Sequence, residues 1–411
     1  MAIGAVIRNR FDTYVDEFTG ARVTRLTDAA HTSHHMYFYA HMTTKDGSRL
    51  LYSPELGGER QVWCMDLASG EAVQLTEGED LDDWSAEFTG DERGVLYQQA
   101  GSVWLLDLES LTRDEVYRAP AGWTMHGLEI SRDALAFTTV EMRTDTVAAP
   151  IGVGGWDFLR ENCLAKPLCR IVRVDVASGA REVLLEQRCW LDHAVMRPGD
   201  SDEVMYCHQG PYDMVDAHLW LMDGNGARVR CARQQPNDVI VSHQFWEPDG
   251  RHLAFVYRDM GLERDRGTVC EEIHEIDPDT LEERVVARCR PLAHCICNQS
   301  GCLFVGDAQG DPTPLHLQRE GDIRARQAAG AVLDDFVYLI DRASGREVRL
   351  AYHGSSWSSR WGTTQDAHPH PCFTEDGNHV LFVTDRFGHP SICMVDLQAF
   401  VEGHPELRQA A

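Results

Sequence analysis

The sequence predicts an all-β protein: a seven-bladed β-propeller whose last blade is closed by an N-terminal strand. Two observations lead to this fold class. A short strand motif that ends in Asp recurs seven times along the 411 residues, and each copy follows a polar turn and an apolar strand. Short strands at such spacing, with turn signals and almost no helical periodicity, are typical of all-β arrays. Four strands per repeat in a closed ring form a propeller, which protects its sheet edges by radial repetition.

The repeated motif places one strand in each blade. In most copies an aromatic or β-branched residue is followed by two further residues and the Asp. The seven copies end at Asp66, Asp107, Asp175, Asp223, Asp277, Asp341 and Asp396. Most are followed by a turn such as Ala-Ser-Gly at 68–70 and then by a charged strand. Seven repeats therefore predict seven blades.

The two ends of the chain are predicted to share a blade. The last repeat stops soon after Asp396, one strand short of the others. Residues 21–27 resemble the outermost strand of the other repeats and can complete that blade. We therefore predict a single domain over residues 1–411, with a rim insertion near residues 140–168 that forms a loop or a short helix.

Composition limits the cellular setting and the partners. Thirteen cysteines without paired spacing are more typical of reduced thiols than of a disulfide framework. Reduced thiols favour a cytoplasmic location. The N-terminus lacks the pattern of a secretory signal, and no apolar run approaches the ~20 residues of a membrane span. A net charge of −27 argues against nucleic acid and anionic membranes as partners, but not against a small anionic substrate. We expect a monomer or a homodimer.

Residues 365–371 offer a candidate metal site. Gln365, His368 and His370 can converge on one cation if the backbone is extended or turning. The two prolines of this segment hold the backbone out of a helix. Imidazole nitrogens with a few oxygens suit Mn, Fe, Ni or Zn, and the Gln ligand favours Mn. Taken alone, the segment also fits a Pro/His-rich surface loop.

The place of this segment in the repeat favours the metal site. In several blades a histidine precedes the polar turn, in or beside the innermost strand. These histidines are His35, His126, His193, His243, His294 and the pair His368/His370. Innermost strands line the channel of a propeller, so the set can build an imidazole-lined cavity, although each histidine alone also fits a core position. We expect His294, from the neighbouring blade, as a fourth ligand. His243, one blade further, remains free as a base with an unperturbed pKa near ~6.5.

The chain resembles the oligogalacturonate lyase family, intracellular seven-bladed propellers of pectin breakdown, over nearly its whole length. The most specific segments are residues 242–250 (Ser-His-Gln-Phe-Trp-Glu-Pro-Asp-Gly), 303–307 (Leu-Phe-Val-Gly-Asp) and 365–371 (Gln-x-x-His-Pro-His-Pro). The resemblance implies a site for Mn²⁺, or another divalent transition metal, with one Gln and three His as ligands. These match Gln365, His368, His370 and His294. The family's proton-abstracting histidine matches His243.

One family residue is replaced. The family has a catalytic arginine at the start of an Arg-Ile-Trp-Leu run, and here the run begins with His218. A histidine can donate a hydrogen bond but carries a less certain charge, so activity on a different uronate-containing oligosaccharide is the alternative. His193 and His208 match family positions and are candidates for substrate binding. Tyr37 and Arg228 are further candidates, although charged residues after a turn are usually solvated.

The implied activity is a metal-dependent β-elimination on short oligogalacturonides such as digalacturonate, which gives an unsaturated or 4-deoxy-5-keto uronate. The metal neutralises the substrate carboxylate and acidifies the C5 proton, which His243 removes. Water, Tyr37 or His218 protonates the leaving O4. Two other classes stay open: a non-catalytic propeller that binds a partner, and a metal-dependent hydrolase or redox enzyme. A hydrolase would need a carboxylate base, for which Asp366 is the only candidate.

Overall fold

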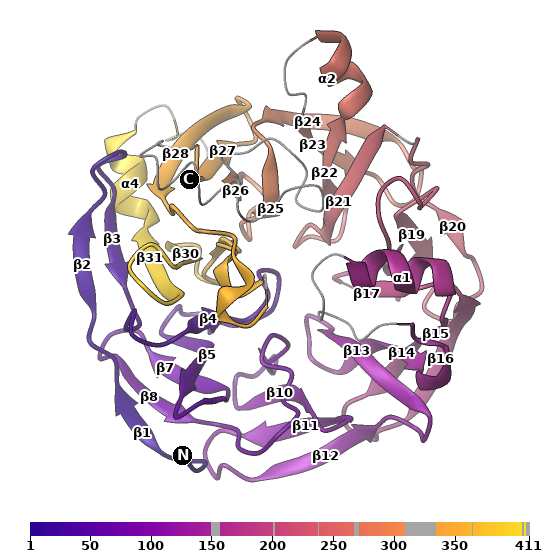
Figure 1. Ribbon diagram of the computed structural model, residues 1–411, viewed down its shortest axis with the longest axis horizontal. Helices are drawn as coiled ribbons and strands as arrows, with labels where there is room; N and C mark the ends of the chain where they lie inside the picture. The colour runs from indigo at the N-terminus through magenta and orange to yellow at the C-terminus, as the bar shows by residue number, and fades with distance from the viewer. Residues whose placement is uncertain are drawn as a thin grey trace. The chain divides into compact units, whose positions relative to one another are not determined.

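The computed structural model describes residues 1–148, 157–199, 202–236, 238–266, 271–308, 334–363, 365–404 and 407. Contacts divide the chain into two compact units. The first comprises Met1–Glu77, Gly267–Ile273 and Val285–Ala411, and the second comprises Gly78–Arg266 and His274–Arg284. Across the described ranges the strands form seven sheets, one for each predicted repeat (Figure 1). The single domain over residues 1–411 stays a prediction.

Three sheets belong to the first unit. The first sheet contains β1 (Val6–Arg8), β4 (Ser33–His35), β5 (Arg49–Leu56), β6 (Glu59–Arg60), β7 (Trp63–Asp66) and β8 (Glu71–Gln74). The sixth contains β25 (Leu292–Cys297), β26 (Leu303–Ala308), β27 (Phe336–Asp341) and β28 (Arg346–Tyr352). The seventh contains β2 (Asp12–Val15), β3 (Arg22–Arg25), β29 (Cys372–Phe373), β30 (His379–Thr384) and β31 (Ser391–Asp396).

The seventh sheet joins the two ends of the chain. Its strand order is β2-β3-β31-β30-β29, so the N-terminal strands lie beside the last strand of the chain (Figure 1). The register pairs Val23 with Val395 and Arg25 with Cys393. β3 lies within residues 21–27, the segment that the sequence assigns to this position. The N-terminal segment thus supplies the strand that the seventh repeat lacks.

Four sheets begin in the second unit. The second sheet contains β9 (Glu87–Phe88), β10 (Gly94–Gln99), β11 (Ser102–Asp107) and β12 (Arg113–Arg118). The third contains β13 (Trp123–Ile130), β14 (Ala136–Arg143), β15 (Leu168–Asp175) and β16 (Arg181–Arg188). The fourth contains β17 (Leu191–Met196), β18 (Val204–His208), β19 (Leu219–Met222) and β20 (Arg230–Cys231). The fifth contains β21 (Val239–Trp246), β22 (Leu253–Asp259), β23 (Glu271–Ile276) and β24 (Glu283–Cys289).

Helical segments are few and short in the described ranges. They are α1 (Asp157–Ala165), α2 (Met260–Arg266), α4 (Leu397–Gly403), η1 (Thr144–Thr146), η3 (Ser359–Trp361) and η4 (Gln365–Ala367). The predicted insertion near residues 140–168 holds η1 and α1, while β14 extends to Arg143; residues 149–156 lie outside the described residues. Phe158 of α1 packs on Trp190, with ring centroids 5.8 Å apart. None of these helices is long and apolar enough to cross a membrane.

The repeated Asp explains why the motif marks a strand end. The Asp66 carboxylate accepts hydrogen bonds from the backbone N–H groups of Ala68 (3.2 Å) and Ser69 (2.7 Å). Asp107 and Asp175 make the same contacts with the residues that follow them. An Asp side chain that satisfies the next two or three N–H groups closes a tight turn. In these three sheets the turn joins β7 to β8, β11 to β12 and β15 to β16, whereas Asp396 of the seventh sheet caps α4.

The core lies between consecutive sheets. In the second unit, Leu221 of the fourth sheet and Phe255 of the fifth belong to one buried apolar cluster. In the first unit, Val305 of the sixth sheet, Phe382 of the seventh and Phe400 of α4 belong to another. Both faces of a strand are therefore buried, which accounts for apolar runs that do not alternate with polar residues.

Candidate metal centre and histidine sites

Three buried histidines of the first unit come together. His294 lies in β25, and His368 and His370 follow η4. One ring nitrogen from each lies within 4.8 Å of the others, a spacing that lets the three bind one metal ion. Gln365, the first residue of η4, is the fourth member that the sequence predicts. The sixth and seventh repeats thus supply the predicted ligand set together.

The donor atoms fit a metal. Nδ1 of His368 and Oε1 of Gln365 are buried, and neither has a hydrogen-bond partner among the described residues. Such atoms cost about 1–3 kcal/mol each unless a ligand satisfies them. Burial lowers the pKa of His294 to about 3 and the pKa of His368 well below its usual value. Both imidazoles are therefore neutral at pH 7, as metal ligands must be.

A buried carboxyl group lies against two of these histidines. Asp307 of β26 accepts hydrogen bonds from the backbone N–H of His294 (2.6 Å) and of His370 (3.3 Å). Its Oδ2 also lies 2.9 Å from Nδ1 of His294. Burial raises the pKa of Asp307 to about 8, because its effect outweighs that of the hydrogen bonds, which lower this pKa. A bound cation would stabilise the charged carboxylate and so lower this pKa.

Aromatic rings border the three histidines. The Trp357 ring lies 4.7 Å from the ring of His368, and the Tyr37 ring lies 5.3 Å from that of His370. Phe38 lies 5.4 Å from His294. These rings keep the imidazoles away from water on their apolar sides. Tyr37, a predicted substrate contact, is thus beside a predicted ligand.

Asp366 is held by a salt bridge. Nη1 and Nη2 of Arg60 donate to its two oxygens at 2.7 and 3.1 Å, and Nη2 also donates to the Trp361 carbonyl at 2.8 Å. The backbone N–H of Thr363 donates to Asp366 as well. A carboxylate with both oxygens engaged in this way is poorly placed to act as a general base. The only carboxylate that the sequence offered to a hydrolase therefore has a structural role.

Three of the predicted histidines share an unusual backbone position. In β17 and β21 the register shifts by one residue, which is a β-bulge, and the first bulged residue is His193 or His243. Their φ angles are +47° and +50°, and His370, at the corresponding place before β29, has a φ of +44°. In β13 the same position is Gly127, with a φ of +72°. A non-glycine residue in this conformation costs on the order of 1 kcal/mol, and a bulge re-aims the side chain.

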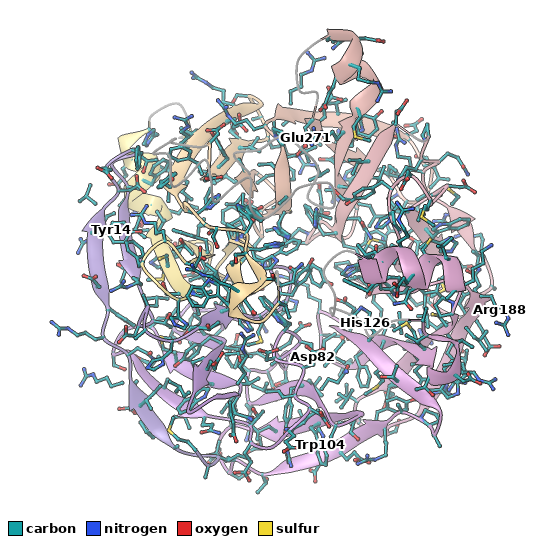
Figure 2. All side chains as sticks on the ribbon, in the orientation of Figure 1. Tyr14, Asp82, Trp104, His126, Arg188 and Glu271 are labelled. Carbon is teal, nitrogen blue, oxygen red and sulfur yellow. The ribbon has the colours of Figure 1, made fainter. Side chains whose placement is uncertain are left out.

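A charged cluster surrounds His193 in the second unit. His126 lies 3.1 Å from the Asp192 carboxylate, and His193 lies 3.7 Å from Glu129. Burial lowers the pKa of His193, but Asp192 and Glu129 outweigh it and raise that pKa to about 9. The same balance raises the pKa of His126, with Asp192 and the nearby Asp82 acting against burial (Figure 2). His193 is therefore a cation at pH 7.

His208 and His218 are neutral. Burial lowers the pKa of each to about 4. His208 stacks on Trp220, with ring centroids 4.6 Å apart, and its Nε2 lies 3.2 Å from Oε1 of Gln187. His218 is 6% exposed, and its Nδ1 has no hydrogen-bond partner among the described residues. The residue in place of the family arginine thus offers a hydrogen-bonding group without a charge.

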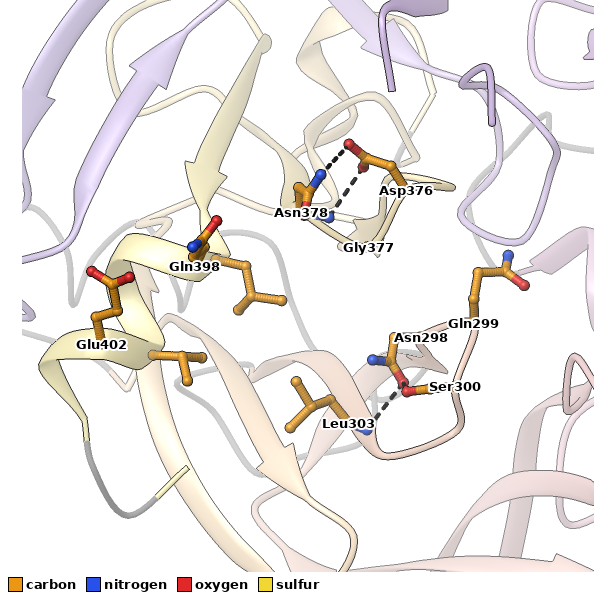
Figure 3. Close-up of a pocket in the computed structure, with 11 residues that line it drawn as sticks. Asn298, Gln299, Ser300, Leu303, Asp376, Gly377, Asn378, Gln398 and Glu402 are labelled. Atoms are coloured by element: carbon orange, nitrogen blue, oxygen red, sulfur yellow. Dashed lines mark hydrogen bonds between the residues drawn. The ribbon is translucent and has the colours of Figure 1, made fainter. Parts of the chain in front are cut away.

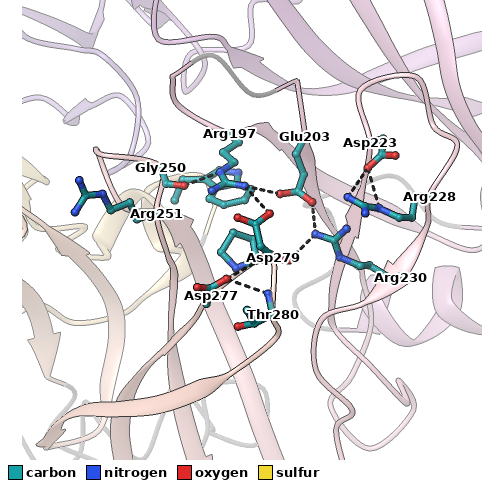
Figure 4. A network of polar contacts seen from close by, with 12 residues as sticks. Arg197, Glu203, Asp223, Arg228, Arg230, Gly250, Arg251, Asp277, Asp279 and Thr280 are labelled. Carbon is teal, nitrogen blue, oxygen red and sulfur yellow. Dashed lines mark hydrogen bonds and ion pairs between the residues drawn. The ribbon is translucent and has the colours of Figure 1, made fainter.

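The arginines near residue 230 belong to a surface network. Arg228 is 66% exposed and pairs with Asp223 at 3.2 Å. Arg230 donates to Glu203 and to the Pro278 carbonyl, and Arg197 joins the same glutamate (Figure 4). These contacts connect the fourth sheet with the loop between β23 and β24. They give Arg228 a local partner at an exposed turn, which does not support a substrate contact.

A pocket of about 1020 Å³ lies elsewhere in the first unit (Figure 3). It is bordered by the turn at 298–300, the turn at 376–378 and one side of α4. No predicted ligand or catalytic residue lines it. It therefore has no part in the site that the histidines form.

Sequence reasoning missed Asp307, Arg60, Asp192 and Glu129. Only Asp307 left a signal, since it is an acidic residue inside the apolar run Leu303–Ala308. A carboxyl group in a buried strand needs a partner, so its presence there points to a structural or functional contact. The other three pair with side chains from distant segments, and no local pattern predicts those pairs, although Asp192 also accepts from the backbone N–H of its neighbour His193 at 2.9 Å.

Comparisons with known proteins find relatives over nearly the whole chain. The family model described as oligogalacturonate lyase matches residues 1–401. An oligogalacturonide lyase of Pectobacterium atrosepticum is 32% identical over 394 residues, covering 95% of this chain and 97% of the relative. A solved oligogalacturonate lyase in complex with manganese is 33% identical, with a TM-score of 0.86 over 96% of this chain and 98% of that one. A second, from Vibrio parahaemolyticus, is 31% identical, with a TM-score of 0.85 over 96% of this chain and 98% of that one. The fold is a seven-bladed β-propeller, which confirms the predicted fold class.

Proposed function

Because the chain belongs to the oligogalacturonate lyase family, we propose that it is a metal-dependent lyase that cleaves short oligogalacturonides by β-elimination. The substrate is digalacturonate or a similar oligomer, and the product is an unsaturated uronate that rearranges to a 4-deoxy-5-keto form. The observation that carries the proposal is the group of three buried imidazoles beside Gln365. This donor set suits a divalent transition metal and does not suit Ca²⁺ or Mg²⁺, which prefer oxygen ligands.

Four side chains would hold the metal. They are Gln365, His294, His368 and His370. Manganese is the ion we assign, because a solved relative of the same family is described with it. When bound, the ion neutralises the substrate carboxylate and so makes the C5 proton acidic.

We assign the removal of the C5 proton to His243. Its half-buried side chain projects from the β-bulge of β21, where the backbone is fixed by the flanking pairs Ser242–Val256 and Phe245–Ala254. A base held in this way loses little freedom when the substrate binds, which lowers the barrier. Transfer of the C5 proton to a ring nitrogen creates an imidazolium and leaves the electron pair on the substrate. Expulsion of O4 then forms the C4–C5 double bond.

His193 and His208 would bind the sugar. His193 is cationic at pH 7 and suits a uronate carboxylate. His208, neutral and stacked on Trp220, suits a sugar hydroxyl. Tyr37, water or His218 would deliver the proton to O4. Since every described cysteine is a free thiol, we also propose that the enzyme works in the reducing cytoplasm, as a monomer or homodimer.

One observation favours a second candidate function. The family arginine is replaced by His218, which burial keeps neutral at pH 7. A neutral group stabilises developing negative charge less than a guanidinium does. The alternative is therefore a lyase of the same mechanism whose preferred substrate is another uronate-containing oligosaccharide.

The test follows ultraviolet absorbance and the mass of the product with digalacturonate, in the presence of Mn²⁺ or of excess chelator. We expect an unsaturated product that the chelator abolishes and added Mn²⁺ restores. His243→Asn is the matched variant for the base, because Asn tolerates a positive φ. It should bind metal and lose activity by about 10²–10⁴-fold. His252→Asn, in the turn before β22, serves as the control. Full activity of His243→Asn would refute the assignment of His243 as the base. No activity on digalacturonate, together with activity on another uronide, would support the second candidate function.

A further inference from the structure

Asp307 connects two of the proposed ligands through one side chain. Oδ1 accepts from the backbone N–H of His294 at 2.6 Å, while Oδ2 lies 2.9 Å from Nδ1 of the same residue. Oδ2 also accepts from the backbone N–H of His370 at 3.3 Å. Three contacts from two ligands thus converge on one carboxyl group. His294 lies in β25 of the sixth sheet and His370 lies just before β29 of the seventh, and Asp307 contacts both.

The environment of Asp307 makes a purely structural carboxyl group costly. The side chain is fully buried in β26, between apolar neighbours. In the described part of the chain no Lys or Arg forms an ion pair with it, and its one such partner is His294. A buried acid without a cationic partner costs several kcal/mol relative to an apolar residue. A cation held by His294 and His370 would remove that cost.

We propose that Asp307 is a positioning residue of the metal centre, which holds His294 with its proton on Nδ1 and its Nε2 lone pair directed at the metal. The inference rests on the proposed metal site. A ligating histidine commonly gives its second ring N–H to a carboxylate, which fixes the tautomer and the ring orientation and increases the basicity of the ligating nitrogen. The two backbone contacts set the distance between the β25 and β29 sides of the site.

The geometry predicts the effect of Asp307→Asn. The new amide has one oxygen and one NH₂ group in place of two acceptors. The backbone N–H of His294 can only donate, so it must face the amide oxygen. The NH₂ group then faces Nδ1 of His294 and the backbone N–H of His370. To accept from that NH₂ group, His294 must move its proton to Nε2, which removes the lone pair that binds the metal. Metal affinity should therefore fall by about 10–100-fold.

The matched control is Asp341→Asn. Asp341 ends β27 of the same sheet, is 2% exposed, and accepts from the backbone N–H groups of Ala343 and Ser344 at 3.2 and 3.1 Å. Its replacement removes a buried carboxylate of the same size without contact with a proposed ligand. Any loss that comes from destabilising the sheet alone should appear in this variant too.

The experiment titrates the full chain and both variants with Mn²⁺ and measures free Mn²⁺ by electron paramagnetic resonance. We expect the Kd of Asp307→Asn to rise by about 10–100-fold and that of Asp341→Asn to stay within about twofold of wild type. An unchanged Kd for Asp307→Asn, or an equal rise in both variants, overturns the inference and leaves the metal site in place. If wild type fails to bind Mn²⁺, both the inference and the proposed metal centre are refuted.

A measurement on the wild-type chain covers the case in which Asp307→Asn does not fold. The chain is loaded with diamagnetic Zn²⁺, and the ¹⁵N shifts of its labelled histidines are recorded. We expect His294 to carry its proton on Nδ1, with the metal on Nε2. A metal-bound Nδ1 in His294 would contradict the proposed role of Asp307.

Discussion

Replacement of Arg60 by Ala should destabilise the first unit and weaken its metal site together. Arg60 makes two hydrogen bonds to the Asp366 carboxylate and one to the Trp361 carbonyl, and Asp366 is fully buried. Removing one partner of a buried ion pair leaves an uncompensated charge and costs about 3–5 kcal/mol. The Thr363 N–H still donates to Asp366, and the Arg60 side chain is 20% exposed, so water can reach the gap. We therefore expect the lower limit, about 3 kcal/mol.

The assay is urea unfolding of wild type and variants, with the Mn²⁺ affinity measured in parallel. Arg25→Ala is the control, since Arg25 pairs with Asp12 at 3.1 Å on the surface and should contribute about 0–1 kcal/mol. Asp366 follows Gln365 in η4, so loss of its anchor should also raise the Kd for Mn²⁺ by roughly tenfold. A loss of unfolding free energy no greater than that of Arg25→Ala, with unchanged metal affinity, would refute the reasoning.

Three further predictions concern the second unit. The raised pKa of His193 stabilises the fold fully below its unfolded pKa of 6.5, and the contribution disappears as the pH rises through about 9. At about 1.4 kcal/mol per pKa unit, wild type should lose up to about 3 kcal/mol more than His193→Asn over this range, measured by urea unfolding at several pH values. His218→Arg should raise kcat/KM on digalacturonate by about tenfold because it returns a charge to the site, and an unchanged value would show that residue 218 does not meet the substrate. Arg228→Ala should leave KM within about twofold, since Arg228 pairs with Asp223 on an exposed turn; a larger rise would return it to the substrate site.

The fold could be predicted because its main signal is local. Most Asp residues of the repeat, such as Asp66 and Asp107, close a turn with residues two and three positions later, so the motif carries its own structural cause. The shortest strands left no such signal. β9 and β29 are two residues long and are set by pairing with β10 and β30, so they appear only when the sheets are assembled.

The residues of the candidate site also divide into those with a local sequence signal and those without one. Gln365, His368 and His370 lie within six residues of one another, across η4 and the residues that follow it, so the grouping can be recognised without knowledge of the rest of the chain. Asp307 contacts residues 13 and 63 positions away, and Arg60 reaches 306 positions along the chain to Asp366. Contacts at such separations are products of the fold, so the supporting residues of the site stay hidden until the structure is known.

The positive-φ bulge positions favour activity at a cost in stability. His193, His243 and His370 each hold a φ that glycine adopts freely, whereas the third sheet places Gly127 at the same position. Each histidine gives up on the order of 1 kcal/mol of stability to hold its side chain there. Mutants screened for heat resistance alone would therefore collect Gly or Asn at residues 243 and 370 and become more stable but inactive, whereas at residue 193 the stabilising charge of the histidine opposes this gain. Directed evolution of this enzyme must couple every thermal screen to a turnover screen.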